Sequence, residues 1–262
     1  MSSIKTRTDG AVAVVTLAEP AIRNAITGEE MLNELLDAID DAENDPEIVV
    51  LVIDAEGPAF SAGGNVKDMA NKDGLFAGSP VEITERYRGT IQQLTRFLAT
   101  TDLVTIASVN GPAIGAGFDL VLGCDLRIGT ARARFAHTFI EMGIVPGDGG
   151  AWLLPRVIGW QRATELAMTA RSIDAEEAVD WGVLLEVVPE SQLSVRVMDL
   201  AETIASKPRP AVVMAKRLLR QARNMDLDAF LEYSAALQAV AHTTPEHEKA
   251  VADYVERLKG RD

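Results

Sequence analysis

The chain has 262 residues, of which 47% are hydrophobic and 24% charged, a composition typical of a soluble globular protein with a full core. Thirty-nine acidic residues outnumber 25 basic ones, and the resulting net charge of −14 argues against nucleic acid or an anionic membrane as a partner. The single cysteine, Cys124, allows no intramolecular disulfide, and we find no apolar leader and no membrane-spanning window. We therefore expect a cytoplasmic protein. With three histidines and one cysteine, we expect no metal.

The first two-thirds of the chain alternate between short apolar strands and helices. Strands are predicted at 11–17 and 49–53, and the second is so uniformly apolar that both of its faces are expected to be covered. Between them, Thr27 and Glu30 predict a capping box, which starts a helix whose apolar stripe runs over 31–39. Further strands are predicted at 104–109, 126–128 and 184–188, and further helices at 118–122, 152–157 and 162–168. This alternation indicates an α/β core.

From about Leu193 onward only helices are predicted. They cover 193–205, 211–222, 227–242 and 246–258. Their apolar stripes are too rich for one small bundle to bury, so we expect them to pack on the core or on another subunit. In the first part of the chain, residues 70–82 are the best candidate for a mobile loop.

Two glycine-rich segments follow predicted strands and can bring backbone amides close to a ligand. The first spans 60–69, and the second, 110–120, opens a buried helix whose free N–H groups and positive dipole end point outward. Two such donors aimed at one oxygen would form an oxyanion hole. Taken alone, a glycine-rich segment before a helix is more often just a tight turn. Neither fits a phosphate-binding P-loop or a dinucleotide fingerprint, which disfavours a nucleotide-phosphate role.

Three segments in this order resemble the successive signatures of the crotonase family, the enoyl-CoA hydratases and isomerases. They are FSAGGNVKDM at 60–69, NGPAIGAGFDL at 110–120 with Cys-Asp at 124–125, and GIVPGDGG at 143–150. The resemblance covers essentially the whole chain. It implies an α/β fold, a crotonase-like spiral of ββα units over 1–192 that binds acyl-CoA, and a helical region over 193–262 that builds homotrimers or dimers of trimers. Family members stabilise a thioester enolate, and because CoA enters as part of the substrate, no separate cofactor is expected.

The resemblance also implies roles for individual residues. The oxyanion donors would be the backbone N–H groups of Gly64 and Ala116. The residues expected to bind CoA are Arg23, Ala62 and Lys67, joined by Tyr254 and Arg257 from the terminal helix of a neighbouring subunit. A terminal arginine is otherwise a surface cation.

The expected catalytic carboxylates depart from the family pattern. A family hydratase uses two glutamates, but here the first position holds the shorter Asp119 and the second holds Phe139, which cannot act as an acid or base. This departure weakens the hydratase assignment. One carboxylate can still move a proton between carbons, so isomerisation of a double bond or another crotonase reaction is possible. His137, Glu141 and Asp148 are candidate replacements, and if the segment around Phe139 is extended, His137 and Glu141 would flank it on the pocket side. We rank Asp119 first, then Asp148, His137 and Glu141.

Each candidate also has a purely structural interpretation: a paired buried acid, a structural histidine, a turn aspartate or a surface carboxylate. Because the second glutamate is absent, a non-catalytic protein that binds CoA esters is the main alternative to an acyl-CoA enzyme. A serine peptidase on the same spiral core is disfavoured. Ser61 and Ser108 lack the Gly-x-Ser-x-Gly setting, and no histidine falls near them in the pattern.

Overall fold

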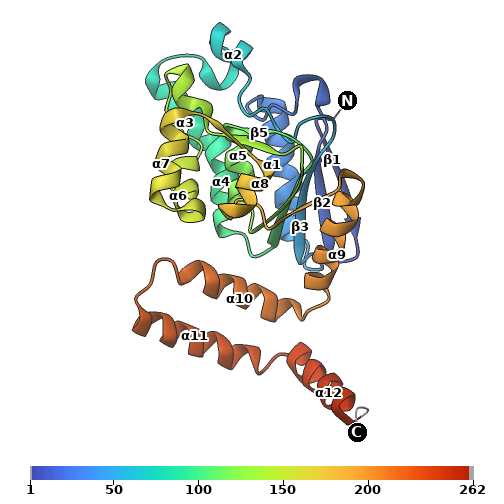
Figure 1. Cartoon of the computed structure of the whole chain (residues 1–262). Helices are drawn as coiled ribbons and strands as arrows, with labels where there is room; N and C mark the ends of the chain where they lie inside the picture. Colours follow the sequence, from blue (N-terminus) through green and yellow to red (C-terminus); the bar gives the residue numbers. More distant parts are fainter. Residues whose placement is uncertain (1, 260–262) are drawn as a thin grey trace.

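The computed structural model describes residues 2–259 and centres on a six-stranded sheet with the strand order β1-β2-β3-β4-β6-β9 (Figure 1). Strands β1 and β2 are antiparallel, and every later pair in this sheet is parallel. The strands are β1 Ile4–Asp9, β2 Val12–Leu17, β3 Val50–Ala55, β4 Val104–Val109, β6 Leu126–Thr130 and β9 Glu186–Val188. A smaller three-stranded sheet contains β5 Ala113–Ile114, β7 Arg134–Ala136 and β8 Ser172–Asp174.

Helices cover both faces of the large sheet. The core helices are α1 Glu29–Asn44, α2 Val66–Asn71, α3 Pro80–Gly89, α4 Ile91–Thr100, α5 Ala116–Gly123, α6 Gly150–Ile158, α7 Trp160–Thr169 and α8 Ala175–Asp180. Short 3-10 turns lie at Pro20–Ile22, Gly74–Phe76, Thr138–Met142 and Glu190–Gln192. The C-terminal helices are α9 Leu193–Ala205, α10 Arg209–Gln221, α11 Leu227–Ala241 and α12 Pro245–Lys259.

Strand β3 shows why its sequence is almost uniformly apolar. Leu51 and Ile53 belong to the main core beneath α1 and α5, whereas Val50 and Val52 belong to a second cluster. That second cluster is closed by Val197 and its neighbours on α9. Successive side chains of a strand point to opposite faces, so a strand buried on both faces needs apolar residues at every position. The expectation of two covered faces is confirmed.

The predicted capping box of α1 is wrong. The helix begins at Glu29 with Gly28 as its N-cap, and no side chain caps it. Thr27 is buried, and its Oγ1 instead accepts a hydrogen bond from the backbone N–H of Asn65 at 2.9 Å. The hydroxyl that local sequence assigns to the helix is therefore used to hold the first glycine-rich segment.

The expected loop over 70–82 is also largely structured. It contains the end of α2, a 3-10 turn and the start of α3 at Pro80. Ser79 and Glu82 form a reciprocal capping box at the N-terminus of α3. Strand β1 was not anticipated, because Ile4 is its only buried residue and the rest of the strand is exposed.

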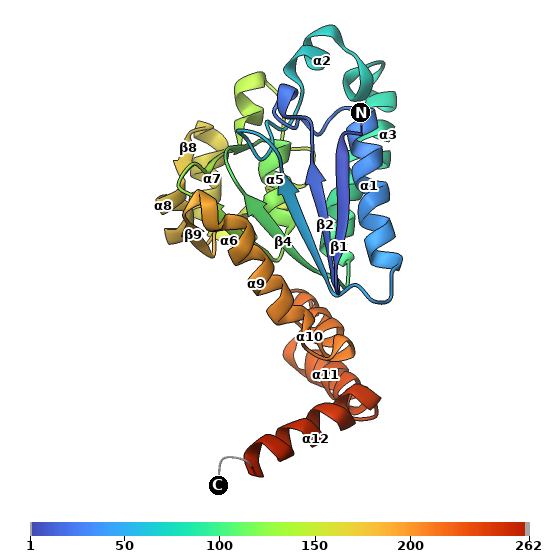
Figure 2. The same cartoon turned by 90° about the vertical axis from the view of Figure 1, so that its right-hand side faces the viewer.

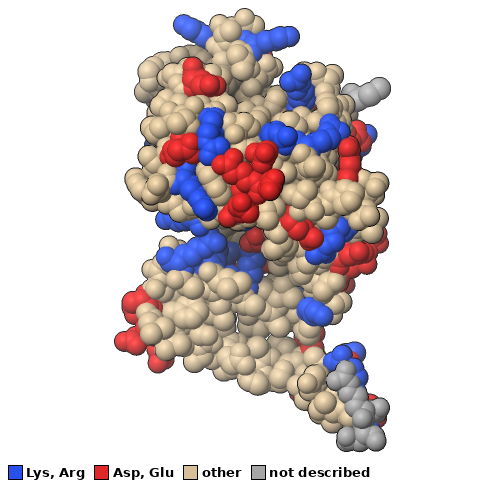
Figure 3. All heavy atoms as spheres, viewed as in Figure 1, with Lys and Arg blue, Asp and Glu red and all other residues tan. Residues whose placement is uncertain are grey.

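Beyond α9 the chain leaves the core. Helices α10, α11 and α12 extend away from the sheet, and α12 lies farthest from it (Figures 1 and 2). Basic side chains gather where α10 meets the core (Figure 3). There Lys216 Nζ lies 2.7 Å from the carboxylate of Asp125, and Arg217 pairs with Asp102. None of the helices in residues 2–259 is both long and apolar enough to cross a bilayer.

Candidate active site

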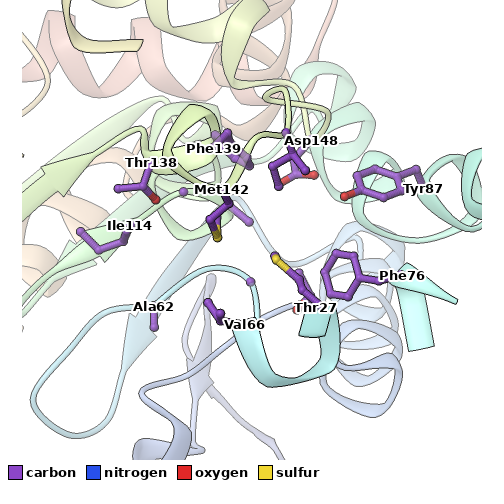
Figure 4. Close-up of a pocket in the computed structure, with 15 residues that line it drawn as sticks. Thr27, Ala62, Val66, Phe76, Tyr87, Ile114, Thr138, Phe139, Met142 and Asp148 are labelled. Atoms are coloured by element: carbon purple, nitrogen blue, oxygen red, sulfur yellow. The ribbon is translucent and has the colours of Figure 1, made fainter. Parts of the chain in front are cut away.

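A cavity of about 130 Å³ lies where the two glycine-rich segments meet the 3-10 turn that follows β7 (Figure 4). Its walls are mostly apolar and contain one carboxyl group. The lining residues are Thr27, Ala62, Gly64, Val66, Met69, Phe76, Tyr87, Ile114, Gly115, Ala116, Thr138, Phe139, Met142, Ile144 and Asp148. A largely apolar pocket with a few polar groups is the usual form of a small-molecule site.

The two glycine-rich segments run side by side because a short parallel bridge joins Ser61 to Ala113. Gly63 makes the close approach possible. It has a φ of +78°, and a Cβ at this position would overlap the carbonyl of Ile114 and lie 3.0 Å from the backbone nitrogen of Ala116. Only glycine combines this left-handed conformation with the absence of a side chain. The backbone at Gly63 therefore lies directly against the start of α5.

The backbone N–H of Gly64 is left free at this junction, although its neighbours are bonded. Ala62 N–H donates to the carbonyl of Arg23, Gly63 N–H to Ser61 Oγ, and Asn65 N–H to Thr27. Within residues 2–259, the Gly64 N–H has no acceptor.

The backbone N–H of Ala116 is free for a different reason. Ala116 is the first residue of α5, and the first N–H groups of a helix have no partner inside it. The carbonyl four residues earlier, that of Pro112, accepts instead from Phe60 and Ser61. Gly64 and Ala116 both line the cavity, and Ala116 lies at the positive end of the α5 dipole.

Asp119 and His137 form a buried pair behind the cavity wall. The Oδ1 atom of Asp119 lies 3.2 Å from Nε2 of His137, and its Oδ2 atom accepts a 3.0 Å hydrogen bond from the backbone N–H of Gly150. Burial raises the pKa of the Asp119 carboxyl, and its hydrogen bonds to His137 and Gly150 oppose that effect. Neither side chain lines the cavity.

Asp148 is the carboxyl group that lines the cavity. Its side chain points toward the hydroxyl of Tyr87 (Figure 4), and the residue is only 4% exposed. Burial, together with the negative charge of nearby Asp119, raises the pKa of Asp148 to about 7. A carboxyl with this pKa can both accept and donate a proton at neutral pH. In the part of the chain that the structure describes, no three His, Cys, Asp or Glu side chains converge to hold a metal ion.

The segment expected to be extended around Phe139 is a 3-10 turn, so the predicted alternation of faces is wrong. His137 lies inside at 1% exposure, whereas Glu141 is exposed and does not line the cavity. Phe139 lines the cavity and packs edge-on against the His137 ring, with 4.8 Å between ring centroids. The phenyl ring therefore contacts both the cavity and the buried histidine.

Two aromatic residues of the wall were not anticipated from the sequence. Phe76 ends a 3-10 turn and Tyr87 lies on α3, in a stretch without any motif. Burial and the neighbouring Asp148 raise the pKa of Tyr87 to about 12, so its phenol keeps its proton and can donate a hydrogen bond.

The predicted CoA-binding residues fall into two groups. Ala62 lines the cavity, Arg23 accepts a backbone hydrogen bond from Ala62 and has an exposed side chain, and Lys67 is exposed on α2. Of these three residues only Ala62 belongs to the cavity wall. Tyr254 and Arg257 lie together on exposed α12, with the guanidinium 5.5 Å from the ring centroid, and the structure does not bring them to the site of their own chain (Figure 1).

Comparisons with known proteins agree on one family. A family model described as enoyl-CoA hydratase/isomerase matches residues 7–261. The chain is 30% identical over 253 residues to a short-chain-enoyl-CoA hydratase of Clostridium acetobutylicum, covering 96% of this chain and 94% of the relative. It is also 30% identical to a 1,2-epoxyphenylacetyl-CoA isomerase of Escherichia coli strain K12, over 97% and 96% of the two chains. A solved enoyl-CoA hydratase from Bacillus anthracis superimposes with a TM-score of 0.90 at 27% identity, covering 97% of this chain and 96% of that one.

Proposed function

The chain belongs to the enoyl-CoA hydratase/isomerase family and has the crotonase fold, and we propose that it shifts the double bond of an acyl-CoA thioester through an enolate intermediate. The observation that carries this proposal is the composition of one cavity wall. It combines two free backbone amides with one carboxyl whose pKa is about 7. Several relatives named as hydratases are 30–36% identical to the chain, and relatives named as an isomerase and as a dehalogenase are 30% identical, so we take the residues of the site to decide between the reactions.

In the proposed reaction, the thioester oxygen accepts hydrogen bonds from the amides of Gly64 and Ala116. The Asp148 carboxylate removes a proton from an acyl carbon, the C–H electron pair moves into the conjugated system, and negative charge develops on the thioester oxygen. Each preorganised donor stabilises such charge by about 3 kcal/mol. Asp148 then returns the proton to a different carbon, the double bond has moved, and no water is consumed.

Asp148 rather than Asp119 takes the role of the proton carrier. Asp119 occupies the first family position, but it does not line the cavity, and its carboxylate oxygens face His137 and the backbone N–H of Gly150. A general acid or base must come within hydrogen-bond reach of the proton that it moves. With Phe139 at the second position, a water molecule lacks the pair of carboxylates that a family hydratase provides. This supports isomerisation over hydration.

The test is incubation with 3-enoyl-CoA and 2-enoyl-CoA thioesters in water enriched in oxygen-18, followed by mass spectrometry. We expect interconversion of the two enoyl isomers without uptake of the label. A labelled 3-hydroxyacyl-CoA would identify a hydratase instead. Binding of the esters with no turnover of either would identify a non-catalytic CoA-ester-binding protein. Asp148→Asn should abolish the interconversion, and Asp180→Asn, an exposed carboxylate on α8, is the matched control.

We also propose that the active assembly is a homotrimer or a dimer of trimers. Helices α11 and α12 contain no buried residue, and the apolar or aromatic side chains of Leu231, Val240 and Tyr254 on them are more than half exposed. Apolar surface of this extent on separate helices favours burial against another subunit. In such an assembly Tyr254 and Arg257 would meet the CoA of a neighbouring site, and Arg23 and Lys67 would meet the CoA of their own.

A further inference from the structure

Asp119 occupies the position of a catalytic glutamate in family hydratases. Its carboxylate contacts His137 and the backbone N–H of Gly150, and it does not line the cavity. Resting on the proposed function, we propose that Asp119 is a positioning residue: together with His137 it fixes the turn that carries Asp148, and its charge sets the protonation of Asp148. Asp119 then acts only through Asp148 and never touches the substrate.

The first support is the hydrogen bond between Asp119 and the turn. Oδ2 of Asp119 accepts from the backbone N–H of Gly150, two residues after Asp148, at 3.0 Å. Gly150 is the first residue of α6, so this bond ties the start of α6 to α5, whose own first amide borders the cavity. A Cβ at position 150 would overlap the Asp119 carboxylate. The hydrogen bond from Gly150 to Asp119 therefore connects α5, which carries the Ala116 amide, to the turn that carries the Asp148 carboxyl group.

The second support is that the same turn is held from its other side by neutral groups. Gln92 Nε2 donates to the carbonyl of Gly147 at 2.9 Å, and the hydroxyl of Thr95 donates to the carbonyl of Asp148. Both side chains come from α4. The turn is thus clamped between α4 and α5, and Asp119 is the titratable group of this clamp.

The third support is electrostatic. The titratable groups near Asp148 are Asp119 on α5, which is itself paired with His137, and Tyr87 on α3, while α4 presents the neutral Gln92 and Thr95. After burial, the charge of Asp119 is the second cause that raises the pKa of Asp148. A neighbouring like charge disfavours ionisation. Removing the charge of Asp119 while keeping its hydrogen bonds must therefore lower the pKa of Asp148.

The deciding variant is Asp119→Asn, whose amide oxygen can still accept from Gly150. We expect the midpoint of the acid limb in the profile of kcat/KM against pH to fall by about one pH unit. The dissociation constant of a saturated acyl-CoA should stay within about two-fold of the wild-type value. Turnover above the limb should persist, unlike in Asp148→Asn. An Asp119→Asn enzyme that binds the ester but is as inactive as Asp148→Asn at every pH would overturn the proposal and make Asp119 catalytic. An unmoved limb would overturn the electrostatic part.

Two further measurements test the proposal if the Asp119→Asn protein does not fold or if the wild type turns over no enoyl ester. If Asp119→Asn does not fold, Gly150→Ala tests the same contact: kcat should fall at least about ten-fold with ester binding kept, and wild-type kcat would refute the clamp. If the wild type turns over no enoyl ester, the proposed function fails, but carbon-13 NMR of the carboxyl groups still reads Asp148. Its titration midpoint should be lower in Asp119→Asn than in wild type, and an equal midpoint would contradict the inference. Asp180→Asn again serves as the control.

Discussion

Replacing Asp148 with Asn should make the free energy of unfolding depend less on pH between about 4 and 7, with loss of activity. The Asp148 carboxyl has its ordinary pKa of 3.8 in the unfolded chain and a pKa of about 7 in the folded protein, because it is buried there beside Asp119. A group whose folded pKa is raised contributes stability that is full below the unfolded value and is lost as pH rises through the folded value. The difference of about 3 units corresponds to about 4 kcal/mol as an upper limit.

Between pH 5 and pH 8.5, this one group should cost the wild type about 3 kcal/mol of unfolding free energy. The cost should be absent in Asp148→Asn. The assay is urea unfolding of both proteins at the two pH values and at one protein concentration, because other groups then cancel in the double difference. Asp180→Asn should follow the wild type. If wild type and Asp148→Asn lose the same stability over this range, Asp148 is not a buried carboxyl with a raised pKa, and the reasoning about the site fails.

Three other predictions concern the cavity, the assembly and the junction with α10. Phe76→Ala enlarges the cavity, so kcat/KM for an eight-carbon enoyl ester should rise about ten-fold relative to a four-carbon one, and an unchanged ratio would argue that Phe76 does not limit the acyl group. Leu231→Glu places a charge on the exposed apolar face of α11 and should reduce the mass measured by light scattering to that of one chain, whereas a wild-type mass would exclude this face from the interface. Lys216→Met removes a buried ammonium from the carboxylate of Asp125, which is one-third exposed, and should cost about 1–2 kcal/mol in thermal unfolding. Lys249→Met, which removes an exposed pair, should be close to neutral, and equal effects of the two lysine variants would refute the distinction.

The parts of the fold that the sequence predicts well are those whose burial repeats with a simple period. The strand at Val104–Val109 and the helix at Leu193–Ala205 have the bounds expected from their apolar patterns. Strand β1 has one buried side chain, so no alternation marks it. Thr27 has the right residue type and spacing for a helix cap, but a backbone amide 38 residues away uses its hydroxyl. Tertiary contacts of this kind carry no local signal.

The candidate site, like the fold, has parts that the sequence predicts and parts that it does not. The amides of Gly64 and Ala116 follow from the resemblance of the two glycine-rich segments to the family signatures, because each signature lies within one segment. Which carboxyl faces the cavity depends on a turn held by side chains of α4 and α5, so the sequence ranked Asp119 above Asp148 whereas the structure places only Asp148 in the wall. Tyr87 comes from a stretch that no motif marks.

The central claim is that the amides of Gly64 and Ala116 polarise a thioester carbonyl. Isotope-edited infrared spectroscopy of a saturated acyl-CoA labelled with carbon-13 at the thioester carbonyl measures this directly, because hydrogen bonding weakens the C=O bond and lowers its stretching frequency. The account predicts a clear downshift on binding, which persists in Asp148→Asn because its donors belong to the backbone. A bound ester whose carbonyl absorbs at the frequency of the free thioester in water would contradict it.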